Sequence, residues 1–190
     1  MKSIKPKFYI IPGWGGKIHS RSYQSLIRSV KGRYVVVPVE LSLTDKQYLF
    51  GKNRQFSEIL KKAKQQIKKG SSKDAIFGFS IGALIAYKLA TKIKFKQVII
   101  CSISPILDED LSLYPPKEVV KIFTPEQVKE LNKIKYGKPK GKTAIFYGTL
   151  ESKECIERSK RLPSDIVTPI KNTKHSLTSN YLKAVKQLIK

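Results

Sequence analysis

The sequence predicts an α/β fold: a three-layer α/β/α sandwich with about six mostly parallel strands. Two observations lead to this expectation. Short apolar runs of strand character alternate with helical patterns along the whole chain, which implies a parallel sheet covered on both faces. The chain has 190 residues, no internal repeat and no composition break, so residues 1–190 are expected to form a single domain.

The N-terminal elements follow this alternation. Phe8–Ile11 is predicted to be a short buried strand that ends at the glycine-rich loop 12–16. Ser20–Val30 carries apolar residues at helical spacing, and Arg33–Val39 contains the β-prone run Tyr-Val-Val-Val. After a polar connection, Phe56–Ile67 has the pattern of an amphipathic helix with a lysine-rich outer face.

The C-terminal elements continue the alternation of strands and helices. Ile81–Leu89 is apolar nearly all round and is therefore predicted to be a buried helix between two strands. The remaining elements are expected at Ala75–Gly78, Val98–Cys101, Thr143–Tyr147 and Ile166–Ile170 as strands, and at Lys153–Arg161 and Leu177–Ile189 as helices.

One stretch interrupts the rhythm. Residues 104–142 are rich in proline and contain a helical piece near Pro125–Ile134 that Thr124 could cap. We expect this insertion to form a small lid above the sheet. Its apolar residues could shape an acyl pocket or belong to a satellite core: Leu107, Leu111, Leu113, Tyr114 and Phe123.

The formal net charge of +24 is the most unusual bulk property. The basic residues are mostly lysine and are spread along the chain, whereas arginine, the better bidentate phosphate ligand, is scarce. No stretch resembles a nucleic-acid-binding module, so nucleic acid is not the expected partner. The charge either solvates an ordinary surface or recruits an acidic carrier or anionic substrate.

Other global features narrow the class of protein. No apolar run is long enough to span a membrane, so we expect a cytoplasmic protein without a membrane span. Cys101 and Cys155 have neither metal-binding nor redox spacing and are expected to be ordinary reduced thiols. No metal or organic cofactor is expected.

A Gly-x-Ser-x-Gly pentapeptide centred on Ser80 is the strongest chemical signal. A predicted strand runs directly into it and a buried helix leaves it, which is the setting of a nucleophile elbow. Such a turn presents the serine hydroxyl at the carboxyl end of the sheet, where ligands bind in open α/β folds. The alternative is that Ser80 simply caps the helix.

A serine nucleophile needs a base, and the chain offers two histidines. His175 lies in the loop after the last strand and is expected to be the base, while His19, near the first loop, is the alternative. The acid is expected to be Glu151, which follows a strand. Glu154 and the group Asp108–Asp110 are rivals, and Asp165 lies at the opposite edge.

An oxyanion hole requires two backbone amides. The amide of Ile81, the residue after the nucleophile, is expected to supply one. The loop after the first strand is expected to supply the other through Trp14, because Gly13 lets the backbone turn toward the site.

Together these segments resemble the α/β-hydrolase superfamily, and in compactness the small bacterial serine hydrolases and carboxylesterases. The glycine-rich loop at 12–16 is similar to the family's histidine-glycine loop, with Pro12 where histidine is common. Gly148-Thr149-Leu150-Glu151 is similar to its Gly-x-x-Asp acid loop, with glutamate in place of aspartate. The order serine, acid, histidine is that of the family; its first two antiparallel strands are missing.

The resemblance implies a compact α/β-hydrolase fold that cleaves a carboxylic ester or thioester of a small acyl substrate through an acyl-enzyme. Two other interpretations remain open. The enzyme could recruit an acidic carrier through its charge, or the chain could be an inactive hydrolase-fold module that binds nucleic acid or an acidic partner.

Overall fold

The computed structural model describes residues 5–13, 16–41, 56–67, 70–104 and 136–189. Within these residues the chain forms one sheet in which all neighbouring strands are parallel, in the order β2-β1-β3-β4-β5-β6. The strands are β1 (Lys7–Ile11), β2 (Val35–Pro38), β3 (Ala75–Ser80), β4 (Gln97–Ile103), β5 (Lys142–Gly148) and β6 (Ile166–Ile170).

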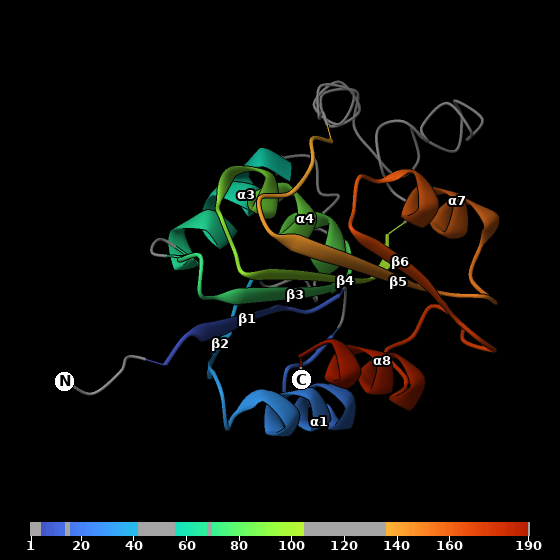
Figure 1. Cartoon of the computed structure of the whole chain (residues 1–190), viewed down its shortest axis with the longest axis horizontal. Coiled ribbons are helices and arrows are strands. Elements are labelled where there is room, and N and C mark those ends of the chain that lie inside the picture. The colour runs from blue at the N-terminus through green and yellow to red at the C-terminus, as the bar shows by residue number, and fades with distance from the viewer. Residues whose placement is uncertain (1–4, 14–15, 42–55, 68–69, 105–135, 190) are drawn as a thin grey trace.

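Five helices among the described residues cover the two faces of the sheet (Figure 1). On one face, α1 (Arg21–Val30) lies beside α8 (Ser179–Ile189). The other face carries α3 (Phe56–Gln66), α4 (Ile81–Lys92) and α7 (Lys153–Arg161). This is the predicted α/β/α sandwich, and within the described residues each predicted strand and helix begins and ends within three residues of its expected position.

Each face of the sheet packs its own hydrophobic core. One core lies under α3 and α4 and includes Tyr9, Ile76 and Ile100, while the other lies under α1 and α8 and includes Phe8, Phe77 and Ile99. Neighbouring strand residues alternate between the two cores because successive side chains of a strand point to opposite faces. As its composition predicts, α4 is buried over all ten residues from Ile81 to Ala90, so its N-terminus is held firmly.

The direction of chain travel across the sheet reverses between β1 and β3. From β1 the chain moves outward to the edge strand β2, whereas from β3 it moves through β4 and β5 to β6. The loops after β1 and β3 therefore diverge at the carboxyl edge, which is where open α/β sheets bind ligands. Ser80 is the last residue of β3 and lies at this switch point.

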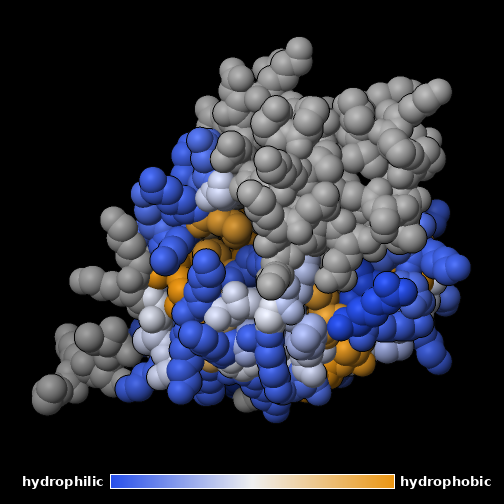
Figure 2. All heavy atoms as spheres, turned by 90° about the horizontal axis from the view of Figure 1, so that it is seen from above, coloured by the Kyte–Doolittle hydropathy of each residue, from blue (hydrophilic) through white to orange (hydrophobic). Residues whose placement is uncertain are grey.

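Several predictions concern residues outside the described part of the chain. They include nearly all of the lid expected at about 104–142, with its helical piece near Pro125–Ile134. None of the described helices is long and apolar enough to cross a membrane. Hydrophilic residues cover most of the described surface seen in Figure 2, as a net charge of +24 leads one to expect.

Candidate active site

The turn between β3 and α4 holds Ser80 in an unusual backbone conformation. Its φ is 56° and its ψ is −124°, a combination that L-residues rarely adopt and that costs on the order of 1–3 kcal/mol. The flanking glycines make the turn possible: a Cβ on Gly78 would lie 2.3 Å from the carbonyl oxygen of Gly82, and one on Gly82 would lie 2.2 Å from that of Ile11. The pentapeptide therefore forms a tight strand-turn-helix elbow.

The Ser80 hydroxyl contacts a histidine and does not cap the helix α4. Its Oγ makes no capping hydrogen bond to α4, although Ser80 occupies the capping position. Instead, Oγ lies 2.8 Å from Nε2 of His175. The structure thus brings together two of the residues singled out from the sequence, 95 positions apart, and the capping alternative for Ser80 does not apply.

His175 is presented by the loop between β6 and α8. Its ring packs against Phe79 with the centroids 5.6 Å apart, and its side chain remains 37% exposed. The loop is tied to the one that follows β5, because Leu150 donates its N–H to the Thr173 carbonyl at 3.0 Å and Thr149 donates to the Ile170 carbonyl at 3.1 Å. These backbone bonds hold the histidine loop and the acid loop together.

Glu151 is buried beside this histidine, and its two carboxylate oxygens have different surroundings. Oε1 accepts hydrogen bonds from the Gly148 N–H at 2.9 Å, the Ser102 hydroxyl at 2.7 Å and the Tyr181 hydroxyl. Oε2 has no hydrogen-bond partner among the described residues and lies 3.7 Å from His175 Nδ1. The acid and the imidazole are thus close without a direct hydrogen bond.

Ser102 fills the gap between them. Its Oγ lies 2.8 Å from Nδ1 of His175 and 2.7 Å from Oε1 of Glu151, and the residue is fully buried as the last but one of β4. The four side chains form one continuous chain of contacts in the order Ser80, His175, Ser102, Glu151.

The electrostatics of the group favour a charged pair. Burial alone would raise the pKa of Glu151, but His175, Tyr181, Ser102 and the Gly148 amide outweigh it and hold the pKa below its usual value. The Cys155 sulfur and the Glu151 carboxylate raise the pKa of His175 to about 9, more than burial lowers it. An ionised acid therefore faces an imidazole that protonates readily.

Cys155 completes a set of possible metal ligands that the sequence spacing does not reveal. The donor atoms of Glu151, Cys155 and His175 all lie within 4.8 Å of one another, and such a set suits Zn²⁺. A cation on Nδ1 would leave the ring proton on Nε2, where it would prevent proton transfer from Ser80. Metal binding through Nδ1 and base catalysis through Nε2 therefore exclude each other in this histidine.

Of the two backbone amides expected to form the oxyanion hole, the structure describes one, that of Ile81. The Ile81 amide is the first of α4 and points out of the helix N-terminus, where backbone N–H groups lack partners within the helix. The Gly13 amide donates to the Tyr23 hydroxyl at 3.1 Å and is thus already engaged. Trp14, the predicted second donor, lies outside the described residues.

The rival candidates for base and acid that the structure describes lie outside this chain of contacts. His19 is exposed after the first loop, and Glu154 interacts with Ser152 and its own backbone at the start of α7. Asp165 accepts from the Thr143 amide at 2.7 Å, at the amino-terminal end of β5 and thus opposite the elbow. Asp108–Asp110 lie outside the described residues.

Ser102, Tyr181 and Cys155 were missed by reasoning from the sequence. Cys155 follows Glu151 by four residues, a separation that could have placed it near the acid. Ser102 lies at the end of a predicted strand's apolar run, and Tyr181 has the spacing of an ordinary core residue of α8. Neither Ser102 nor Tyr181 belongs to a sequence motif that would indicate a role at the site.

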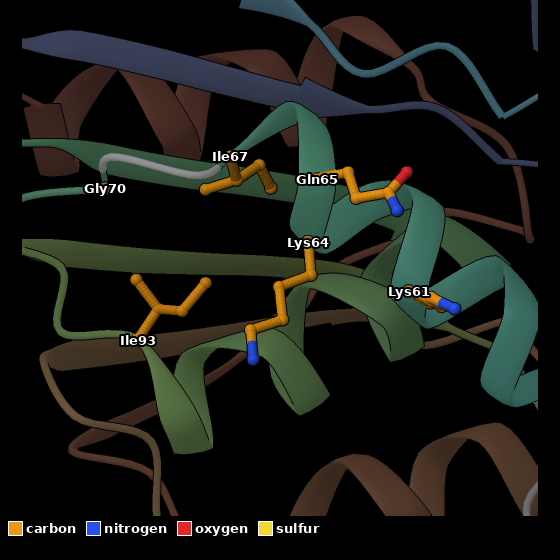
Figure 3. A pocket seen from close by; sticks show the side chains of 6 residues that line it. All are labelled: Lys61, Lys64, Gln65, Ile67, Gly70 and Ile93. Carbon is orange, nitrogen blue, oxygen red and sulfur yellow. The ribbon is translucent and has the colours of Figure 1, made fainter.

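A hollow of about 320 Å³ is formed by α3 and by the segments that follow α3 and α4 (Figure 3). Its lining combines three polar residues of α3 with three apolar ones: Lys61, Lys64, Gln65, Ile67, Gly70 and Ile93. It sits where α3 and α4 end, at the amino-terminal edge of the sheet, so it is separate from the carboxyl edge that carries Ser80.

Comparison with solved structures identifies the fold. Est1E from Butyrivibrio proteoclasticus matches with a TM-score of 0.70 and 14% identity over 97% of this chain and 85% of its own. Alpha/beta hydrolase domain-containing protein 10 from mouse matches with a TM-score of 0.67 and 12% identity over 100% and 90%. The Vlm2 thioesterase domain matches with a TM-score of 0.61 and 18% identity over 97% and 95%.

These similarities show that the chain has the α/β-hydrolase fold, as the sequence resemblance implied. No family model and no curated protein matches the sequence.

Proposed function

We propose that this protein is a serine hydrolase that cleaves a carboxylic ester or thioester of a small acyl substrate. One observation carries the proposal: a strained elbow holds the Ser80 hydroxyl 2.8 Å from the Nε2 atom of His175. This is the nucleophile–base contact that acyl transfer requires. Proteins of the same fold include Est1E, which has been seen with ferulic acid bound, and a thioesterase domain.

In the proposed mechanism Ser80 attacks the substrate carbonyl while His175 takes its proton. Glu151 stabilises the imidazolium that forms, and the amides of Ile81 and Trp14 bind the oxyanion. His175 then protonates the leaving alcohol or thiol, and a water molecule, activated by the same histidine, hydrolyses the acyl-enzyme. No metal or organic cofactor takes part.

Labelling with a fluorescent fluorophosphonate tests the nucleophile. The parent protein and Ser29→Ala, which changes an exposed serine on α1, should be labelled, while Ser80→Ala should not. The assay should contain a chelator, because of the Glu151, Cys155 and His175 donor set. Equal labelling of the Ser80→Ala variant would show that another residue reacts, and an unlabelled parent would contradict the proposal.

The net charge of +24 favours a second candidate, an inactive module that binds an acidic partner or nucleic acid. It predicts binding that weakens steeply with salt and no labelling of the parent. If the parent is labelled, salt dependence separates the two enzyme interpretations. The kcat/KM for an acidic carrier-bound thioester should fall with salt, while that for a small neutral ester should not.

A further inference from the structure

We propose that Ser102 is a positioning residue through whose hydroxyl Glu151 orients His175. This inference rests on the proposed function, and it adds a residue to the three expected from the sequence. It follows from the hydrogen-bond geometry around the Ser102 hydroxyl and from the backbone that presents it.

The distances favour an indirect path from acid to base. The direct approach of Glu151 Oε2 to His175 Nδ1 is 3.7 Å, too long for a hydrogen bond. The Ser102 hydroxyl lies 2.7 Å from Glu151 Oε1 and 2.8 Å from Nδ1, so both contacts fall within hydrogen-bond range. A hydroxyl has one proton to donate and two lone pairs, so it can serve both partners at once.

The direction of these bonds fixes the tautomer of the histidine. An ionised carboxylate only accepts hydrogen bonds, so the single proton of Ser102 is committed to Glu151. Toward His175 the hydroxyl can then only accept, which places the ring proton on Nδ1. Nε2 is left with a lone pair facing Ser80 Oγ, the form that a general base needs.

The backbone of β4 is distorted at this position. Phe79 pairs with Cys101 and Ser80 pairs with Ile103, so Ser102 is an extra, unpaired residue of a β-bulge. Its φ is 51°, in the left-handed region. As a result Cys101 packs in one core and Ile103 in the other, although residues two apart in a regular strand share a face.

The bulge frees the side chain of Ser102 from the alternation of the strand. The hydroxyl thereby reaches the acid and the base instead of packing in either core. Glycine would adopt this φ with less strain, so the backbone itself does not account for a serine here. The two side-chain contacts do account for it.

The test compares Ser102→Gly, which suits the positive φ, with Ser102→Ala. The readout is the rate of fluorophosphonate labelling as a function of pH, with thermal unfolding to confirm folding. We expect the plateau rate of labelling, reached at the pH values where His175 is neutral, to fall at least tenfold. We also expect the midpoint of the pH profile to fall, because the imidazolium loses its link to the carboxylate. If one of these two variants fails to fold, the other still tests the proposal.

A double-mutant cycle isolates the connection. If Ser102 acts through Glu151, then adding Ser102→Gly to Glu151→Gln should slow labelling little further. Fully additive losses would overturn the relay. So would an unchanged rate, or a slower rate with an unchanged pH midpoint, which indicates a purely structural role. An unlabelled parent would instead contradict the proposed function, so the two failures are distinguishable.

Discussion

Truncating Glu151 to alanine should destabilise the fold as well as remove activity. Oε1 is the acceptor for three buried donors: the Gly148 amide, the Ser102 hydroxyl and the Tyr181 hydroxyl. Glu151→Ala leaves them without their acceptor, at about 1–3 kcal/mol each. Even with partial relaxation the loss should be roughly 3–6 kcal/mol, a large share of the 5–15 kcal/mol that stabilises a typical domain. The unfolding midpoint should fall by roughly 6–24 °C.

Glu151→Gln is the matched variant, because it keeps the acceptor and removes the charge. Its carbonyl oxygen can replace Oε1, while its NH₂ group takes the place of Oε2, which has no hydrogen-bond partner among the described residues. Stability should therefore stay close to that of the parent. Glu151→Gln also removes the negative charge that stabilises the imidazolium, so activity should fall on the order of 10²–10⁴-fold.

Thermal unfolding and the labelling rate, measured on both variants, separate the two roles. We expect Glu151→Ala to lose both stability and labelling, and Glu151→Gln to lose mainly labelling. Parental labelling by Glu151→Gln would mean that another carboxylate serves His175. A parental unfolding midpoint for Glu151→Ala would mean that the three donors do not depend on this acceptor.

Two further predictions concern the base and the elbow. The pKa of His175 is raised to about 9, and the base must be neutral to accept a proton. The rate of labelling, measured with a chelator present, should therefore rise about tenfold per pH unit below pH 9 and level off above it. A plateau that begins at pH 7 would contradict this prediction. Gly82→Ala places a Cβ 2.2 Å from the Ile11 carbonyl oxygen and should abolish labelling or folding, whereas Gly32→Ala, with nothing within 4 Å, should change neither. Labelled, stable Gly82→Ala protein would show that the elbow is less tightly packed than described.

The layers of the fold could be predicted because they depend on local patterns. The apolar run Ile81–Leu89 can only be a buried helix, and the breaker before it can only be a turn, so the position of Ser80 followed from its neighbours in sequence. The loops after β5 and β6 were predictable for the same reason, because parallel strands bring their carboxyl ends to one edge. The sequence could therefore indicate that Glu151 and His175 lie at the same edge of the sheet as Ser80.

The link from Glu151 to His175 through Ser102 could not be predicted in this way. It depends on the bulge at Ser102, which arises from the pairing of β4 with β3 and not from any turn residue in the sequence. Tyr181 reaches the carboxylate from α8, 30 positions along the chain, and only the packing of that helix on the sheet puts its hydroxyl there. Such contacts are properties of the assembled layers.

The backbone bonds between the acid loop and the histidine loop have a consequence for how the protein is made. Synthesis proceeds from the N-terminus, so Ser80 emerges from the ribosome well before the strand β6 and the loop that carries His175. The elbow can form from residues that are near one another in sequence. His175 lies on the loop that follows β6, a strand that pairs with β5, and the same loop accepts a hydrogen bond from Leu150 at Thr173. A nascent chain would thus carry an unactivated serine until its last strand docks, and the onset of reactivity would report the completion of folding.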